Sequence, residues 1–272
     1  MSLVTTDWLL ENLNDVKIID SSWHLPNQNR NAILEYSNEH IKNAIFFDID
    51  KFSDQDTELP HMLPKVTIWE NIVSNLGISN QDKIVVYDNS DLISSCRCWY
   101  TFIYFGHDPS LVSVLNGGLK KWKQEAKPVV KSETFISKSI YKAKENKEMV
   151  KSKNEIDKNI SLKNFRVVDA RSLERFQGKA PEPRTNVRGG SIKGSSCLPF
   201  NELINKKDNT FKTVENLDLI FKKVLNTNDN DVVFTCGSGI TASVLALAYS
   251  LINTKYMPTI YDGSWSEYGL IK

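Results

Sequence analysis

The strongest constraint on the fold is an internal repeat that covers almost the whole chain of 272 residues. Five segments of the first half have counterparts in the second half, in the same order: residues 16–20 and 165–170, 39–49 and 189–200, 83–88 and 231–236, 95–105 and 242–251, and 111–122 and 257–268. Short β-branched runs such as VKIID and FRVVDA predict buried strands, and they alternate with segments of helical spacing. This order predicts an α/β protein of two tandem domains, each a mainly parallel sheet with helices on both faces.

The two copies are separated by a stretch of different composition. From about residue 128 to residue 158 the chain is rich in Lys, Ser and Glu and has little periodicity. This composition is typical of a linker between domains. We therefore predict domains at residues 1–130 and 158–272, joined by a linker at 131–157.

The segment DVVFTCGSGITASVLALAYSL, residues 231–251, carries the clearest sign of chemistry. Its first apolar residues predict a buried strand, and residues 242–251 predict a buried helix. Between them lie six loop residues: Cys236, Gly237, Ser238, Gly239, Ile240 and Thr241. Such a turn directs backbone N–H groups and the positive end of a helix dipole toward the cysteine sulfur. The loop is therefore expected to favour the thiolate, which is the nucleophilic form of cysteine.

Three interpretations of this loop compete. A tyrosine-phosphatase-like loop needs an arginine at position 242 to bind phosphate bidentately, and the residue there is Ala242. A buried structural cysteine is common at the end of a strand, but it does not explain the Gly-x-Gly turn that follows. The third interpretation is a cysteine that carries an anionic or persulfide sulfur in a cradle of backbone amides.

The loop CGSGITA resembles the active-site loop of sulfurtransferases with the rhodanese fold, in the version found in 3-mercaptopyruvate sulfurtransferases. Relatives that use thiosulfate usually carry basic side chains inside this loop, whereas Gly237 and Ser238 are neutral. Asp88 occupies in the first copy the position of Cys236, so the first copy lacks the nucleophile. One reactive copy beside one unreactive copy is similar to the tandem rhodanese family, over about residues 5–270. The first copy is then expected to supply a wall of the active site at the domain interface.

The resemblance implies a role for each residue of the loop. Cys236 would attack the outer sulfur of the donor and become a persulfide, which an acceptor then removes. Backbone N–H groups would hold the persulfide, with Gly237, Gly239, Ile240 and Thr241 as the binding residues. Ser238 would form a proton relay with His61 of the PHMLP motif and Asp50 of the FFDID motif, acting on the enolate of departing pyruvate. A turn-forming serine and a solvated loop histidine are the simpler alternatives.

Two arginines, Arg184 and Arg188, lie in the loop PEPRTNVRGG. Guanidinium groups bind carboxylates bidentately, and the resemblance of PEPR to the family's substrate loop implies that both arginines hold the mercaptopyruvate carboxylate. Two surface arginines are the simpler alternative. The next stretch, GGSIKG, departs from the family's G-H-I-P-G, which should loosen the turn. Asp169, Arg171 and Arg175 also match family positions and are expected to form structural ion pairs.

Composition limits the compartment and the partners. A net charge of +1 and a pI of about 7.6 give no reason to expect nucleic acid or an anionic membrane as a partner. The N-terminal sequence lacks the pattern of a signal peptide, so the cytoplasm is the expected location. The four cysteines have no zinc-site spacing and are expected to be free thiols. No metal or organic cofactor is expected, and the chain is expected to act as a monomer.

These observations lead to one main hypothesis and two alternatives. The main hypothesis is an enzyme that moves sulfur from 3-mercaptopyruvate through a Cys236 persulfide to a thiol, a dithiol protein such as thioredoxin, or cyanide, with release of pyruvate. The first alternative is the same chemistry with thiosulfate as the donor. The second is a non-enzymatic module that senses redox state or delivers persulfide to a partner protein.

Overall fold

Two five-stranded sheets with the same strand order form the framework of the protein. The first sheet has the order β1 (Leu3–Val4), β5 (Val112–Leu115), β4 (Ile84–Tyr87), β2 (Lys17–Asp20) and β3 (Ala44–Phe46). The second has the order β6 (Val150–Lys151), β10 (Ile260–Tyr261), β9 (Val232–Thr235), β7 (Arg166–Asp169) and β8 (Ser196–Cys197). Every pairing between these strands is parallel. The identical order and direction confirm the internal repeat and the predicted fold class.

The computed structural model describes residues 2–225 and 231–271, and the chain divides into two compact units. The first unit comprises Met1–Asp56, Leu63–Asn146 and Lys206–Thr210, and the second comprises Thr57–Met62, Lys147–Asn205 and Phe211–Lys272. The short segment Thr57–Met62 therefore belongs to the second unit although it lies in the first copy of the repeat. The predicted terminal boundaries at residues 1 and 272 lie outside the described residues.

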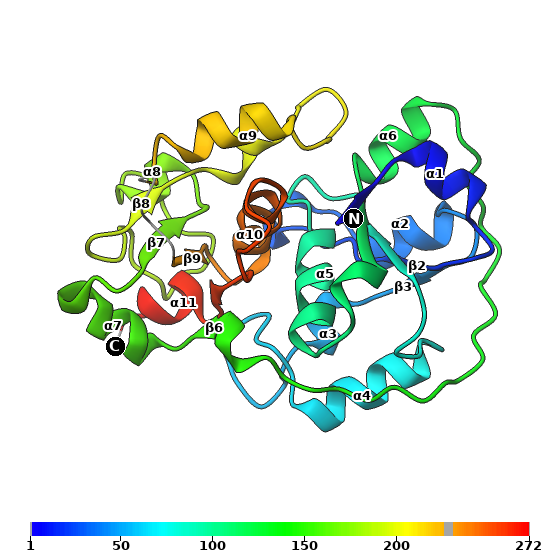
Figure 1. Ribbon diagram of the computed structural model, residues 1–272, viewed down its shortest axis with the longest axis horizontal. Helices are drawn as coiled ribbons and strands as arrows, with labels where there is room; N and C mark the ends of the chain where they lie inside the picture. The colour runs from blue at the N-terminus through cyan, green and yellow to red at the C-terminus, as the bar shows by residue number, and fades with distance from the viewer. Residues whose placement is uncertain (1, 226–230, 272) are drawn as a thin grey trace. The chain divides into compact units, whose positions relative to one another are not determined.

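Helices cover both faces of the first sheet, as Figure 1 shows. On one face lie α1 (Thr6–Glu11), α2 (Ala32–Asn38) and α6 (Gly118–Gln124), and on the other lie α4 (Val66–Asn75) and α5 (Ser95–Tyr104). Leu9 and Trp122 pack with Val85 of β4 on the first face. On the second face, Trp69 stacks on Phe105 at 5.0 Å between ring centroids. All four residues of β4 are buried, because a parallel strand covered on both faces has no solvated side.

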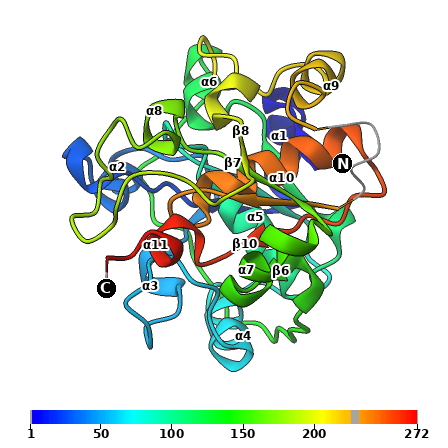
Figure 2. The same ribbon diagram turned by 90° about the vertical axis from the view of Figure 1, so that its left-hand side faces the viewer.

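The second unit repeats this arrangement. Its helices are α7 (Lys153–Leu162), α8 (Leu173–Phe176), α9 (Val214–Phe221), α10 (Ile240–Ile252) and α11 (Ser264–Tyr268). Val167 and Val233 pack with Trp265 of α11 on one face, and Figure 2 shows α7 and α11 together there, away from α9. On the other face, Phe234 packs against Tyr249 of α10 at 5.9 Å between ring centroids. Residues 240–249 of α10 are all buried, in agreement with the predicted all-apolar helix.

The remaining elements are short. They are α3 (Ile49–Phe52) and the 3₁₀ turns η1 (Pro26–Gln28), η2 (Pro109–Leu111), η3 (Lys147–Met149) and η4 (Phe200–Leu203). Residues 147–157, which the sequence assigns to the linker, form η3, β6 and the start of α7 in the second unit. Among the described residues, no helix is long and apolar enough to cross a membrane.

Candidate active site

Cys236 lies between the central strand β9 and helix α10 of the second unit. Cys236 is 1% exposed. Gly239 leads the chain into α10 with a φ of 82°, a left-handed conformation that suits glycine. The backbone of Cys236 is fixed on both sides: its carbonyl accepts the Trp265 N–H at 2.9 Å, and its N–H donates to Ser264 Oγ at 3.3 Å. A helix of 13 residues thus begins four positions after the sulfur, with its positive dipole end toward this loop.

Ser238 and His61 are in direct contact. The distance from Ser238 Oγ to His61 Nδ1 is 2.8 Å, and the two residues are 6% and 4% exposed. His61 belongs to the Thr57–Met62 segment of the second unit and has a φ of 62°, a strained conformation for a residue other than glycine. Such strain is typical of functional sites. The arrangement allows the Ser238 hydroxyl to exchange a proton with the imidazole.

Asp50 lies in the first unit, in α3, where Trp23 Nε1–H donates a hydrogen bond of 2.9 Å to its Oδ2. This bond fixes the orientation of the carboxylate. The participation of Asp50 in the relay stays a prediction.

The two predicted substrate arginines differ in their surroundings. Arg184 is half-buried, and its carbonyl accepts the Val187 N–H at 3.4 Å. Arg188 is exposed, and its guanidinium lies over the Trp265 ring at 4.7 Å from the centroid. The backbone of Arg188 also contacts Trp265, because the Arg188 carbonyl accepts a hydrogen bond of 2.7 Å from Trp265 Nε1–H. Their binding of a carboxylate stays a prediction.

The ion pairs expected at the end of β7 are present. Arg171 binds Asp169 at 2.6 Å, and both side chains are 1% exposed. Burial opposes the charge of Arg171, but hydrogen bonds and the charges of Asp169 and Glu182 outweigh it and raise the pKa of the guanidinium. Arg175 pairs with Glu182 at 2.5 Å. A Cβ built on Gly237 would lie 3.3 Å from Arg175 Nη2, so this guanidinium is beside the Cys236 loop.

Two residues near Cys236 were not predicted from the sequence, and Arg175 was predicted only as part of a structural ion pair. Glu182 had no assigned role in PEPR, and Ser264 had none in YDGSW. Comparison of the two copies offers a signal for Ser264, because the matching residue of the first copy is Gly118. Both residues are left-handed, with φ of 49° and 55°. A serine that takes a glycine conformation, and whose hydroxyl binds the Cys236 N–H, is a candidate functional residue.

The other three cysteines are poorly suited to nucleophilic chemistry. Cys96 and Cys98 are fully buried in α5, and burial raises the pKa of both thiols. Cys197 is half-buried at the end of β8, where burial and then the charge of Asp169 raise its pKa to about 12. Only a small fraction of these thiols is ionised at neutral pH, so each is a weak nucleophile.

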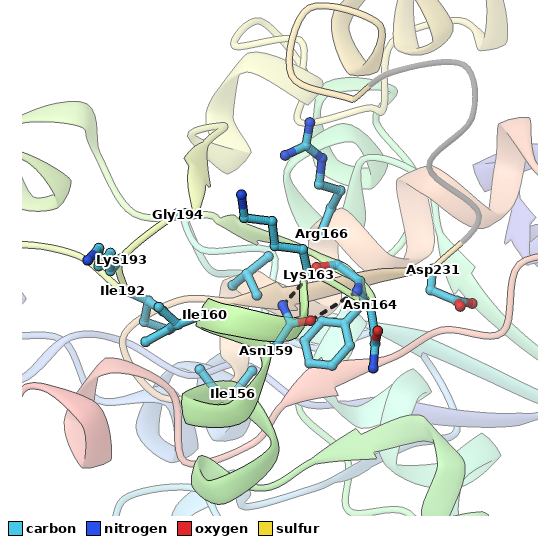
Figure 3. Close-up of a pocket in the computed structure, with 12 residues that line it drawn as sticks. Ile156, Asn159, Ile160, Lys163, Asn164, Arg166, Ile192, Lys193, Gly194 and Asp231 are labelled. Carbon is cyan, nitrogen blue, oxygen red and sulfur yellow. Dashed lines mark hydrogen bonds between the residues drawn. The ribbon is translucent and has the colours of Figure 1, made fainter.

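The cavity in Figure 3 lies at the end of the second sheet where β7 begins. It has a volume of about 640 Å³ and is lined by the start of β7, the end of α7 and the loop near Lys193. Arg166 begins β7, whereas Cys236 follows the last residue of β9, and these two strands are parallel. In parallel α/β sheets the reactive groups lie beyond the carboxyl ends of the strands, so this cavity is separate from the candidate active site.

Comparison with known proteins agrees with this geometry. The Rhodanese family model, described as a rhodanese-like domain, matches residues 5–125 and 152–270. The chain is 36% identical to mouse 3-mercaptopyruvate sulfurtransferase and 36% identical to mouse thiosulfate sulfurtransferase, in each case over 98% of this chain and 91% of the relative. Among solved structures, SseA from Escherichia coli, a 3-mercaptopyruvate sulfotransferase, has a TM-score of 0.87 and 32% identity over 98% of this chain and 100% of that chain.

Proposed function

This chain belongs to the rhodanese-like domain family, and we propose that it is a sulfurtransferase that takes a sulfur atom from 3-mercaptopyruvate onto Cys236. The choice of donor rests on one contact: Ser238, two residues after Cys236, has its Oγ 2.8 Å from His61 Nδ1. Thiosulfate needs no proton when its sulfite leaves as an anion. The enolate of pyruvate does need one, and a serine–histidine pair can supply it.

The reaction has two halves. The Cys236 thiolate attacks the sulfur of 3-mercaptopyruvate, the carbon–sulfur bond breaks, and its electron pair leaves with the carbon as the enolate of pyruvate. The Ser238–His61 pair delivers a proton to that carbon, which gives pyruvate and leaves a persulfide on Cys236. An acceptor thiolate then attacks the outer sulfur of the persulfide and releases the Cys236 thiolate.

The surrounding residues divide the binding between them. Amides of the loop from Gly237 to Thr241 hold the persulfide, at the N-terminal end of α10. Arg184 and Arg188 bind the donor carboxylate, and Asp50 orients the relay. The loop residues Gly237 and Ser238 are neutral, and Arg175, whose guanidinium lies beside Gly237, supplies a positive charge there.

The acceptor is a thiol, and a dithiol protein such as thioredoxin fits because its second thiol releases the sulfur as sulfide. We place the reaction in the cytoplasm, where the four free cysteines of this chain would persist as thiols. The chain acts as a monomer in this proposal, which size-exclusion chromatography with light scattering tests.

Thiosulfate is the second candidate donor. The mouse relatives with the two activities are each 36% identical to this chain, so identity to them does not favour one donor. A guanidinium beside Gly237 would also suit a dianion.

Comparison of the two donors tests the proposal. The wild-type chain should release pyruvate from 3-mercaptopyruvate with a dithiol acceptor, with a higher kcat/KM than for thiosulfate, and Cys236→Ser should abolish both reactions. A clear preference for thiosulfate would exclude 3-mercaptopyruvate as the main donor. Normal folding with no turnover of either donor would instead favour a persulfide-binding or redox-sensing module.

A further inference from the structure

Glu182 is a buried carboxylate whose two oxygens are both used by arginines. Its side chain is 3% exposed. Oε1 accepts from Arg171 Nη1 at 2.6 Å, and Oε2 accepts from Arg175 Nη2 at 2.5 Å and from Arg175 Nε at 3.2 Å. A carboxylate that contacts two guanidinium groups in this way fixes the position of both.

Arg171 is the fixed side of this arrangement. Its other nitrogens bind Asp169 and the carbonyl of Gly190, and its guanidinium lies over the Trp265 ring at 4.4 Å from the centroid. Arg171 is also 2% exposed, so it anchors Glu182 and is not available to a substrate.

Arg175 is the exposed side of the arrangement. Its side chain is 23% exposed, and Nη2, the same nitrogen that binds Glu182, lies near Gly237. A partly exposed arginine can adopt several rotamers, and not all of them place the guanidinium beside the loop. The contact with Glu182 selects the rotamer that keeps the charge beside Gly237.

We propose that Glu182 is a positioning residue that holds the Arg175 guanidinium at the Cys236 loop, where it attracts the anionic group of the sulfur donor. This inference deepens the proposed function and rests on it for the identity of the anion. The position of the charge, however, can be tested without any sulfur donor.

The test compares an anionic with a neutral alkylating agent of similar size. Iodoacetate and iodoacetamide are reacted with the full-length chain, and the adduct on the Cys236 peptide is followed by mass spectrometry. The ratio of the two rate constants reports the electrostatic potential at the sulfur and cancels general changes in thiol reactivity. Arg175→Met gives the ratio expected when the charge is lost.

Glu182→Gln separates positioning from a simple charge effect by the sign of the change. Loss of a negative charge, with Arg175 still in place, would raise the preference for iodoacetate. Loss of positioning should instead lower the ratio by about tenfold, toward that of Arg175→Met. Glu174→Gln, an exposed change next to Arg175 in α8, should leave the ratio unchanged.

Glu182→Asp covers the case in which Glu182→Gln does not fold. It keeps the negative charge but shortens the side chain, so the ratio should fall although the net charge is unchanged. A ratio that rises in Glu182→Gln, or that equals the wild-type value in the folded variants, would overturn the proposal. Failure of the wild-type chain to use either sulfur donor would contradict the proposed function, while the ratio would still decide the role of Glu182.

Discussion

The ends of β4 and β9 share a backbone framework but hold different residues, a carboxylate in the first copy and the proposed nucleophile in the second. Asp88 follows β4 and Cys236 follows β9, and the carbonyl of each accepts a backbone N–H at 2.9 Å, from Leu119 and Trp265 respectively. In the first copy, the Asp88 carboxylate accepts N–H groups of the following loop and helix, from Ser90 at 2.8 Å and Ser95 at 2.9 Å. The repeated unit can therefore hold an anion with its amides whether or not it carries a nucleophile.

The two copies differ in the charges around this shared framework. At the end of β7, Asp169 is paired with the buried Arg171, whereas the matching Asp20 at the end of β2 has Ser22 in place of the arginine. Without a cationic partner, burial raises the pKa of Asp20 to about 6. The Ser238–His61 contact and the Arg171–Glu182–Arg175 network both belong to the second unit. We therefore predict that reactivity depends on Cys236 together with these added groups, and that the amide cradle alone does not confer it.

The largest effect is expected from making the second copy resemble the first. Cys236→Asp should fold, because the matching position of the first copy holds a carboxylate. Turnover of 3-mercaptopyruvate should fall by a factor of about 10³ or more, because the nucleophile is lost. Adding Asp88→Cys to this variant should not restore turnover, and a rate near that of the wild type would show that the cradle is sufficient.

Removal of the proton relay should have the next largest effect. His61→Ala and Ser238→Ala should each lower kcat for 3-mercaptopyruvate by about 10²–10⁴-fold, the usual contribution of general acid–base catalysis. The double variant should lose little more than either single one, since the two residues act as a pair. Unchanged rates in folded His61→Ala would remove it from the relay.

The two arginines of the PEPRTNVRGG loop should differ in importance. Arg184→Ala should lower kcat/KM for 3-mercaptopyruvate by an amount that corresponds to about 1.5–3 kcal/mol, the value of a hydrogen bond to a charged group. Arg188→Ala should also lower this kcat/KM, but by an amount that corresponds to only about 0.2–1 kcal/mol, because its guanidinium is exposed and a charge pair there is screened by solvent. Steady-state kinetics with both donors checks this, and equal losses with thiosulfate would argue against a carboxylate-specific role.

Exchanging the residue types at Gly118 and Ser264 tests whether the two copies need the same left-handed backbone at this position. In Gly118→Ser the new Cβ would lie 2.5 Å from the Asp88 carbonyl oxygen at a φ of 55°, so the variant should lose about 2 kcal/mol of unfolding free energy. In Ser264→Gly, relief of strain offsets the lost hydrogen bond, and the change should stay within about 1 kcal/mol. Urea unfolding of the full chain measures both, and a greater loss in Ser264→Gly would contradict the comparison.

The smallest effect concerns Asp20, which has Ser22 as its partner where the matching Asp169 has an arginine. The folded-state pKa of Asp20, about 6, lies above the ordinary value of 3.8, so its protonated form stabilises the fold at low pH and this contribution is lost as pH rises through about 6. Asp20→Asn should therefore gain about 1 kcal/mol relative to the wild type between about pH 5 and about pH 8.

Tryptophan fluorescence during urea unfolding can follow this difference, because five of the six tryptophans belong to the first unit. Asp15→Asn, an exposed change in the same unit, is the control. If the difference in unfolding free energy between Asp20→Asn and the wild type were the same at about pH 5 and about pH 8, Asp20 would not be protonated in the folded chain.

The order of the strands and helices could be predicted from the sequence because it depends on local patterns. Buried β-branched runs, all-apolar helices and the internal repeat each predict structure without knowledge of distant contacts. Gly77, which follows α4 with a φ of 69°, is a similar local signal, because glycine commonly ends a helix in this conformation. Some local detail could not be predicted. Three residues that can cap a helix, Thr5, Thr6 and Asp7, stand side by side at the start of α1, and only the structure shows that Thr5 caps it by accepting the Trp8 N–H at 3.1 Å.

The residues that surround the nucleophile were harder to predict, because their roles depend on loops that meet only in the folded chain. Glu182 lies 54 positions before Cys236 in the sequence, and only the fold brings its partner Arg175 beside Gly237. Ser264 is a common residue in a short motif, and nothing local shows that its hydroxyl binds the Cys236 N–H. Cys236, by contrast, could be identified because its strand, glycine turn and helix are contiguous.

The most direct test of the proposed Cys236 persulfide is to find where the sulfur is bound after one half-reaction. The full-length chain is mixed with 3-mercaptopyruvate without an acceptor, and its peptides are examined by mass spectrometry under conditions that preserve persulfides. The proposed mechanism gives one added sulfur atom on the Cys236 peptide, with pyruvate released in equal amount. Sulfur on Cys96, Cys98 or Cys197, or pyruvate release without sulfur on Cys236, would contradict it.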